Sequence, residues 1–134
     1  DVYKRQVIGL MATDGTIQTG IYGRKAKSMK LAMVVPDKEH QTMVMEAIYG
    51  EKGVKAGYTD GYCKEVLLKA AEHLVKDKGA QALILGCTEL PLILEETDNL
   101  KLGGGHAAIV DPTSSLARRV VKVAGEITKI RGVR

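Results

Sequence analysis

Four short apolar runs alternate with longer amphipathic segments along the 134 residues, and this alternation limits the fold more than any other feature. The runs cover residues 7–12, 30–35, 82–85 and 107–110, and Gly, Pro or Asp follows each within two residues. Buried strands of a parallel sheet have this appearance, and strands that alternate with helices form such sheets. The sequence therefore predicts an α/β fold with a doubly wound, parallel, four-stranded sheet flanked by helices.

The segments between the runs have the patterns of helices. Residues 16–27 and 39–49 each predict a helix, and residues 58–78 predict the longest, with an apolar stripe along one side. A final helix is expected near the C-terminus, with Asp111, Ser114 or Ser115 as its cap. Residues 98–105 are expected to form a loop, and residues 1–134 to form a single domain.

The run at residues 82–85 ends in a strand-turn-helix pattern that contains a cysteine. Gly86 permits a sharp bend, and Pro91 at the start of a helix loses no hydrogen bond. Cys87 is thereby placed at the carboxyl end of a strand, where open α/β sheets bind ligands. Helix amides at that position would favour the thiolate, so Cys87 is the candidate reactive residue. The alternative is that Cys87 only packs in the core, which is the commoner role of a free cysteine.

The composition argues against nucleic acid and membrane partners. The net charge is +4, but the basic residues are spread along the chain, and Phe and Trp are absent, so the signature of a nucleic-acid surface is weak. No apolar run approaches the ~18 residues of a membrane-spanning helix. The two cysteines, Cys63 and Cys87, form no disulfide framework, which favours a cytoplasmic location.

Three other kinds of site are not expected. The histidines lack the spacing of a metal-ligand set, so no metal is predicted at His40, His73 or His106. The glycines at residues 103–105 lack the Lys-Ser/Thr pair of a phosphate loop. A thiol phosphatase also has a cysteine after a strand, but it would need an arginine where this chain has Ile93. Cys63 lies at the start of a predicted helix and is expected to be a packing residue.

The motif Gly-Cys-Thr-Glu-Leu-Pro-Leu at residues 86–92 resembles the second-cysteine motif of the aspartate/glutamate racemase superfamily. Other segments of the chain also resemble this superfamily and occur in the same order as in its members. They are residues 9–16, 20–22, 35–37, 45–49, 54–57 and 110–113. The resemblance covers residues 4–126. Glutamate racemases have His after the Cys-Thr pair, whereas this chain has Glu89, which is similar to the aspartate racemase branch.

The resemblance implies an organisation for the whole enzyme. Members of the superfamily have two pseudo-symmetric α/β domains with one cysteine each, and the active site lies between the domains. They use no cofactor, and pyridoxal phosphate in particular is not expected. The chain would then be the C-terminal half of an aspartate racemase that is a homodimer at full length. Residues 1–6 separately resemble a translated adapter and are expected to be a non-native leader. In the family, the cysteine of the other half lies in a Cys-Asn-Thr motif. Without that half, this chain alone would be inactive.

The resemblance also implies roles for individual residues. Cys87 would exchange a proton with Cα of an acidic amino acid, most simply aspartate, while a second cysteine acts on the opposite face. Hydroxyls and amides would stabilise the enolate-like α-carboxylate, and the candidates are Thr88, Thr13 and Thr16, although the last two suit helix capping equally well.

Two charged residues complete the predicted site. Lys55 would bind the distal carboxylate, unless it is simply solvated. Glu89 would orient or tune the thiol, or else favour a helix N-terminus. A different class of function also fits these strand ends, namely a non-catalytic α/β domain that binds a carboxylate or dimerises. A lone half would expose apolar surface, which favours association.

Overall fold

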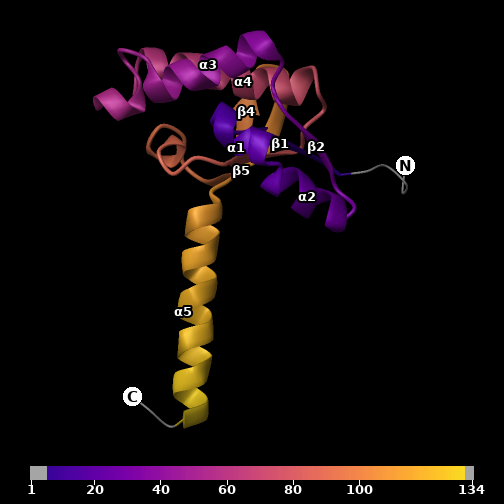
Figure 1. Ribbon diagram of the computed structural model, residues 1–134, viewed down its shortest axis with the longest axis vertical. Helices are drawn as coiled ribbons and strands as arrows, with labels where there is room; N and C mark the ends of the chain where they lie inside the picture. The colour runs from indigo at the N-terminus through magenta and orange to yellow at the C-terminus, as the bar shows by residue number, and fades with distance from the viewer. Residues whose placement is uncertain (1–5, 132–134) are drawn as a thin grey trace.

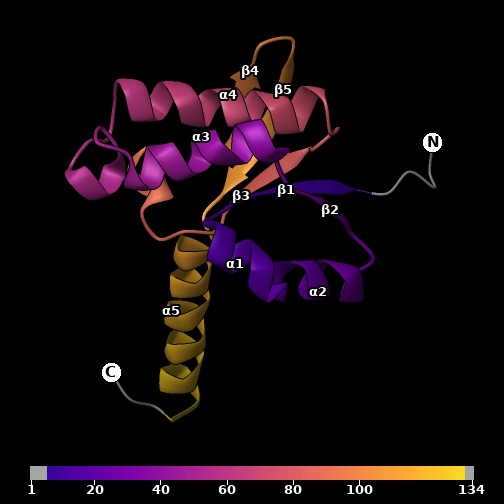
Figure 2. The same ribbon diagram turned by 45° about the horizontal axis from the view of Figure 1, so that its top comes forward.

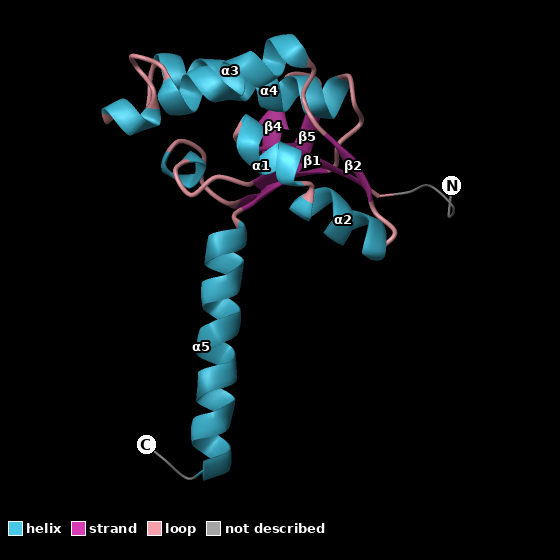
Figure 3. Cartoon of the chain, viewed as in Figure 1, coloured by secondary structure: helices cyan, strands magenta, loops and turns pink. Residues whose placement is uncertain are grey.

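A five-stranded sheet organises the computed structural model, which describes residues 6–131 (Figures 1 and 3). Its strands lie in the order β2-β1-β3-β5-β4. They span β1 (Val7–Met11), β2 (Ala32–Val34), β3 (Ala82–Leu85), β4 (Thr97–Leu102) and β5 (Gly105–Val110). All neighbours pair in parallel except β4, which runs antiparallel to β5. The predicted α/β class with a mostly parallel sheet is confirmed.

The predicted number of strands is wrong, because residues 98–105 are not a loop. Most of this segment forms β4 and the turn into β5, and Gly103 adopts a left-handed conformation with φ 58° in that turn. The pattern of β4 is apolar at Leu100 and Leu102 and polar between and before them, which is typical of a strand with one buried face. The polar side chains conceal this alternation when the segment is read as a sequence.

Helices cover both faces of the sheet (Figure 2). On one side lie α3 (Lys38–Tyr49) and α4 (Tyr62–Lys76), and on the other lie α1 (Asp14–Thr19) and α2 (Ile21–Ser28). The helix predicted at residues 16–27 is in fact two helices, because Gly20 between them is left-handed, with φ 70°. Two short 3-10 turns, η1 (Val54–Ala56) and η2 (Leu90–Leu92), follow α3 and β3.

The main core lies between α4 and the sheet and is aliphatic. Its fully buried side chains include Leu67, Leu74, Leu83, Leu85 and Ile109. Cys63 belongs to the same core with 0% exposure, so its predicted packing role is confirmed. Burial of each large aliphatic side chain stabilises the fold by about 1.5–3 kcal/mol, and this burial holds the strand ends in place.

The last helix, α5 (Pro112–Arg131), extends away from the body of the molecule (Figures 1 and 2). Asp111 caps it, because Oδ1 accepts from the Thr113 amide at 3.0 Å and Oδ2 accepts from the Ser114 hydroxyl at 2.8 Å. Of the three caps considered, Asp111 is therefore the one used. None of the helices within residues 6–131 is long and apolar enough to cross a membrane.

One of the sequence expectations falls at the N-terminus. The leader predicted for residues 1–6 lies outside the described residues except for Gln6, whose carbonyl accepts from the Ala32 amide at 3.0 Å.

We expect Leu74→Ala to lower the free energy of unfolding by about 2–5 kcal/mol, because it leaves a cavity where α4 meets the sheet. The matched control is Leu92→Ala, since Leu92 is 62% exposed and should cost less than about 0.5 kcal/mol. Urea denaturation of both variants measures the difference. Similar losses for the two would contradict the assigned core.

Candidate functional site

The candidate site lies where β1 and β3 end side by side. Met11 pairs with Leu85 in the parallel register, and the Gly86 amide donates to the Met11 carbonyl at 2.8 Å. Thr13 and Cys87 each follow two residues after this pair, so both emerge from the same edge of the sheet. The predicted position of Cys87 at a strand's carboxyl end agrees with this geometry.

Gly86 is needed at this edge because the two strands approach closely there. A Cβ at this position would lie 2.8 Å from Leu10 Cδ1 and 3.0 Å from Ala12 Cβ. Any other residue would have to displace the Leu10 side chain and the Ala12 methyl group at the point where the site begins. The glycine before the cysteine therefore fixes where the thiol is held relative to β1.

Glu89 is the centre of a hydrogen-bonded cluster around the thiol. Its Oε2 accepts from Cys87 Sγ at 2.9 Å and from Thr88 Oγ1 at 3.0 Å. Its Oε1 accepts from Lys55 Nζ, which reaches across from η1, at 3.1 Å. Lys55 Nζ also lies 5.4 Å from the centre of the Tyr49 ring. Four residues selected from the sequence thus meet in one contiguous group: Lys55, Cys87, Thr88 and Glu89.

These contacts set the protonation of the cluster. Hydrogen bonds from Cys87, Lys55 and Thr88 lower the pKa of Glu89 from 4.5 to about 2, so it is a carboxylate. Burial raises the pKa of the Cys87 thiol, and its hydrogen bond to Glu89 raises it further. The hydrogen bond to Glu89 raises the pKa of Lys55. The cluster therefore holds an ion pair beside a neutral thiol.

The expectation that Cys87 is a thiolate is wrong for this state. The amides of Glu89 and Leu90 do lower the pKa of the thiol, as a helix N-terminus should. Their effect on the pKa is outweighed, first because burial disfavours the charged thiolate and then because the Glu89 carboxylate faces the sulfur. In this arrangement the raised pKa favours the protonated form of the Cys87 sulfur.

Thr13 and Thr16 form the N-terminal cap of α1. The Thr13 Oγ1 accepts from the Thr16 amide at 3.2 Å and donates to Thr16 Oγ1 at 3.1 Å. The capping role is therefore present in the structure. A role in substrate binding stays a prediction for both residues.

Gln41 is a polar residue of this edge that the sequence did not reveal. From α3, its Nε2 donates to the Ala12 carbonyl and to Asp14 Oδ1, both at 2.9 Å. Its Oε1 is buried and has no hydrogen-bond partner among the described residues. Buried polar atoms without a partner are rare in folded proteins. Within a helix, a single Gln carries no signal that would have distinguished it.

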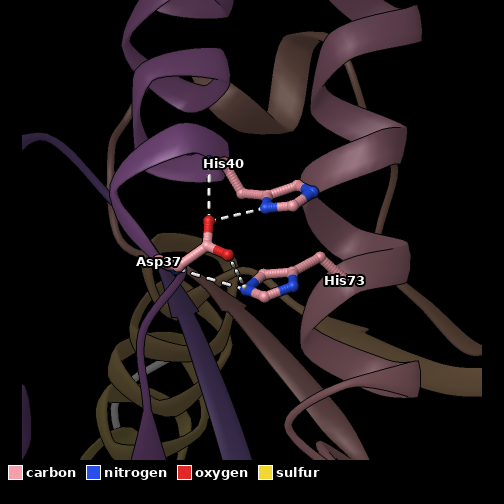
Figure 4. Close-up of side chains that lie close together, drawn as sticks. All are labelled: Asp37, His40 and His73. Carbon is pink, nitrogen blue, oxygen red and sulfur yellow. Dashed lines mark hydrogen bonds and ion pairs between the residues drawn. The ribbon is translucent and has the colours of Figure 1, made fainter.

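A second polar cluster joins α3 to α4, and Figure 4 shows its three side chains. The carboxylate of Asp37 accepts from the His40 amide at 2.9 Å and lies 2.6 Å from His40 Nδ1. The Asp37 amide donates to Nε2 of the buried His73 at 3.2 Å, and His73 Nδ1 lies 2.7 Å from Asp77. The two imidazole rings stack with centroids 3.9 Å apart.

His40 and His73 are far apart in the sequence but adjacent in space, which their spacing along the chain did not indicate. Atoms of Asp37, His40 and His73 that could bind a metal lie within 4.8 Å of one another. However, the rings are parallel to within 5°, so their in-plane lone pairs do not converge on one point. The hydrogen bond from the His40 amide lowers the pKa of Asp37, as expected for a helix cap. The arrangement therefore suits helix capping and packing better than metal binding.

Comparison with known sequences finds a family and several relatives. The family model for Asp/Glu/hydantoin racemase matches residues 3–120. An uncharacterized protein from Pectobacterium carotovorum subsp. carotovorum is 32% identical over 117 residues, which cover 86% of this chain and 71% of that protein. A glutamate racemase from Limosilactobacillus reuteri (strain DSM 20016) is 26% identical over 117 residues, covering 87% of this chain and 40% of that enzyme.

Solved structures share the fold. A crystal structure of an aspartate racemase homologue from Pyrococcus horikoshii OT3 matches with a TM-score of 0.71 and 25% identity, covering 90% of this chain and 49% of that one. The aspartate racemase of Picrophilus torridus matches with a TM-score of 0.59 and 28% identity, covering 90% and 46%. The chain thus spans less than half the length of both structures and of the glutamate racemase.

The ionised Glu89 gives stability that depends on pH. Its folded pKa of about 2 lies below the ordinary 4.5, so its contribution is complete above pH 4.5 and is lost as pH falls toward 2. We expect the wild type to lose more free energy of unfolding between about pH 6 and about pH 3 than Glu89→Gln does. Urea denaturation at each pH measures this loss. The control is Glu95→Gln, at an exposed carboxylate without a partner among residues 6–131, which should follow the wild type. Equal losses in all three proteins would contradict the cluster.

Proposed function

The chain belongs to the Asp/Glu/hydantoin racemase family, and we propose on that premise that it forms one half of a cofactor-independent amino-acid racemase acting on an acidic substrate, most simply aspartate. The match of the family model to residues 3–120 confirms the resemblance first seen at residues 86–92. The observation that carries the proposal is the contact of the Cys87 thiol with Glu89, which is itself paired with Lys55. This group combines a proton donor with a cation at an open strand end.

The proposed chemistry is proton transfer on two faces of Cα. An opposing base removes the α-proton, and the electron pair of the C–H bond is delocalised into the α-carboxylate. Cys87 then gives its proton to the other face, its S–H bond breaks and the sulfur becomes a thiolate. In the reverse direction this thiolate removes the proton. The neutral state of Cys87 in the cluster favours the donor role.

The opposing acid–base group would come from a second α/β unit. Cys63 is unsuited to this task, because it is fully buried in α4 and its Sγ donates to the Asp60 carbonyl at 3.4 Å. The carbanion needs hydrogen bonds on the α-carboxylate, for which Thr88 and Thr13 are the candidates at this edge.

Lys55 would recognise the distal carboxylate of the substrate by exchanging partners. It is half-exposed and binds Glu89, which is the same kind of group as the substrate's side chain. A bound aspartate could therefore take over part of this contact, and Glu89 would then lose a stabilising cation. Both cysteines are free thiols, which supports a cytoplasmic setting for the reaction.

A second candidate function is a non-catalytic unit that binds a carboxylate or dimerises. The exposed apolar side chains of α5 favour it, since Leu116, Val120 and Val121 are all more than half exposed. The same edge would then hold a carboxylate through Lys55 without proton transfer at Cys87. The activity of Cys87 variants separates the two candidates.

We expect this chain alone not to exchange the α-proton of L-aspartate with D₂O faster than buffer does, because one face lacks its base. In the assembled two-unit enzyme, Cys87→Ser should lower kcat by roughly 10²–10⁴-fold, the usual range for a positioned acid or base. Cys63→Ser is the control for a thiol outside the site. Proton NMR of the Cα signal measures the exchange. Full activity of Cys87→Ser would reject catalysis by this thiol and favour the binding role.

We expect Lys55→Gln in the same enzyme to raise KM for aspartate about tenfold or more, since it removes a charge-assisted contact with the distal carboxylate. Activity on alanine, which has no distal carboxylate, should change little. Lys52→Gln, at an exposed lysine of the neighbouring turn, is the matched control. A parallel loss on both substrates would show that Lys55 acts through Glu89 rather than on the substrate.

A further inference from the structure

Lys55 reaches the Cys87 cluster from a segment that turns back over the end of α3. This segment, residues 50–57, follows α3 directly and contains η1, and we call it the arm. The Lys55 side chain is 44% exposed and that of Glu89 is 30% exposed. An ion pair this open to water holds together weakly, because ordering a long lysine side chain costs entropy. Whether Lys55 stays on Glu89 therefore depends on how firmly the arm is fixed.

Gly53 lies where the arm passes the last turn of α3. A Cβ at this position would lie 2.8 Å from the Glu46 carbonyl oxygen and 2.9 Å from that of Ala47. It would also lie 3.0 Å from the amide nitrogen of Gly50. All three are backbone atoms, so no flexible side chain can move aside to make room. Glycine is the residue that permits two stretches of backbone to approach this closely.

The residues after Gly53 hold the rest of the arm in place. The Gly53 carbonyl accepts from the Ala56 amide at 3.1 Å and from the Tyr58 amide at 3.2 Å. The side chain of Val54 is 7% exposed and belongs to the main core. The two residues before Lys55 are thus fixed in different ways, the first by close backbone packing and the second by burial of its side chain.

We propose that Gly53 is a positioning residue, which packs the arm against α3 and so places the Lys55 ammonium group on Glu89. A side chain at this position would force the arm away from α3 until the contacts with the carbonyl groups reached ordinary van der Waals distance. Lys55 is only two residues further along and would move with the arm. Its Nζ lies 3.1 Å from Glu89 Oε1, and a hydrogen bond weakens when such a distance grows.

The other two glycines of the arm serve different purposes. Gly57 ends η1 in a left-handed conformation with φ 99°, so its backbone rather than its surroundings favours glycine there. Gly50 lies close to the Glu46 carbonyl, which lets the chain leave α3, but it is five residues from Lys55. Gly53 is the glycine that fixes the arm next to Lys55.

For catalysis, this inference rests on the proposed role of Lys55 in binding the substrate. Its geometric part does not, because the pair of Lys55 with Glu89 belongs to the chain itself whatever reaction the chain serves. The pair also provides a measurement on the chain alone, since the hydrogen bond from Lys55 is one of the contacts that lower the pKa of Glu89 to about 2. The two parts can therefore fail separately.

Gly53→Ala in the 134-residue chain tests the geometric part. Carbon-13 NMR of the Glu89 carboxyl group during an acid titration follows its pKa. We expect Gly53→Ala to raise this pKa by at least about half of the rise that Lys55→Gln produces, since the ammonium group no longer meets the carboxylate. The matched control is Gly104→Ala, where a Cβ would have open space among the described residues and the pKa should stay as in the wild type. An unchanged pKa in Gly53→Ala or in Lys55→Gln would overturn the proposal.

Circular dichroism and urea denaturation check that each variant is folded. If Gly53→Ala does not fold, Val54→Ala replaces it in the titration, because it loosens the arm from the core and leaves the close approach to α3 intact. It should also raise the pKa of Glu89. No rise in a folded Val54→Ala chain would overturn the proposal, because Lys55 would then find Glu89 without a fixed arm.

The assembled two-unit enzyme tests the catalytic part. We expect Gly53→Ala to raise KM for aspartate about threefold or more, in the same direction as Lys55→Gln, with a smaller change in kcat. Activity on alanine should stay near that of the wild type. A raised pKa of Glu89 with an unchanged KM would support the positioning by Gly53 and reject substrate binding by Lys55. Equal losses on aspartate and alanine would overturn a role of Gly53 through Lys55.

Discussion

The parallel pairing of β1 with β3 is the contact on which the rest of the structure depends. It brings Gly9 so close to Leu83 that a Cβ on the glycine would lie 2.7 Å from Leu83 Cδ2. The same pairing joins Gly86 to Met11 and ends both strands at one edge. The main core beneath it is aliphatic and rigid, so the side chains that leave this edge start from fixed positions. The polar groups of two distant parts of the sequence meet there for this reason.

Glu89 gives that edge its chemical character. One carboxylate accepts from a thiol, a hydroxyl and an ammonium group, and it stays charged because all three donors favour the charged form. The same carboxylate raises the pKa of the neighbouring Cys87 thiol, which favours the neutral form of the sulfur. A substrate that draws Lys55 away would remove one of the contacts that lower the pKa of Glu89. The pKa of Glu89 would then rise, and its carboxylate would be a better proton acceptor. In the proposed function, Glu89 would thereby couple substrate binding to the protonation of Cys87.

The sequence and the structure agree where local pattern decides the outcome. The four parallel strands and the position of Cys87 follow from apolar runs and turn residues, which act over a few positions. The strand β4 was missed because a half-buried edge strand is mostly polar. Three features were missed because they depend on tertiary packing. They are the stacking of His40 on His73, the ion pair of Glu89 with Lys55, and the buried acceptor atom of Gln41. The charge of the thiol was predicted wrongly for the same reason, since the opposing carboxylate is defined only once the turn has folded.

The two outer strands of the sheet have a consequence for how the chain can associate. An unpaired strand edge invites pairing with another chain, and proteins suppress this with short, charged or irregular edges. Here β2 has three residues and β4 is polar, with a register irregularity between Thr97 and Leu100. Neither edge offers a long, regular template for a neighbouring backbone. The sheet is thus poorly suited to edge-to-edge pairing, which is the first step of growth into fibrils.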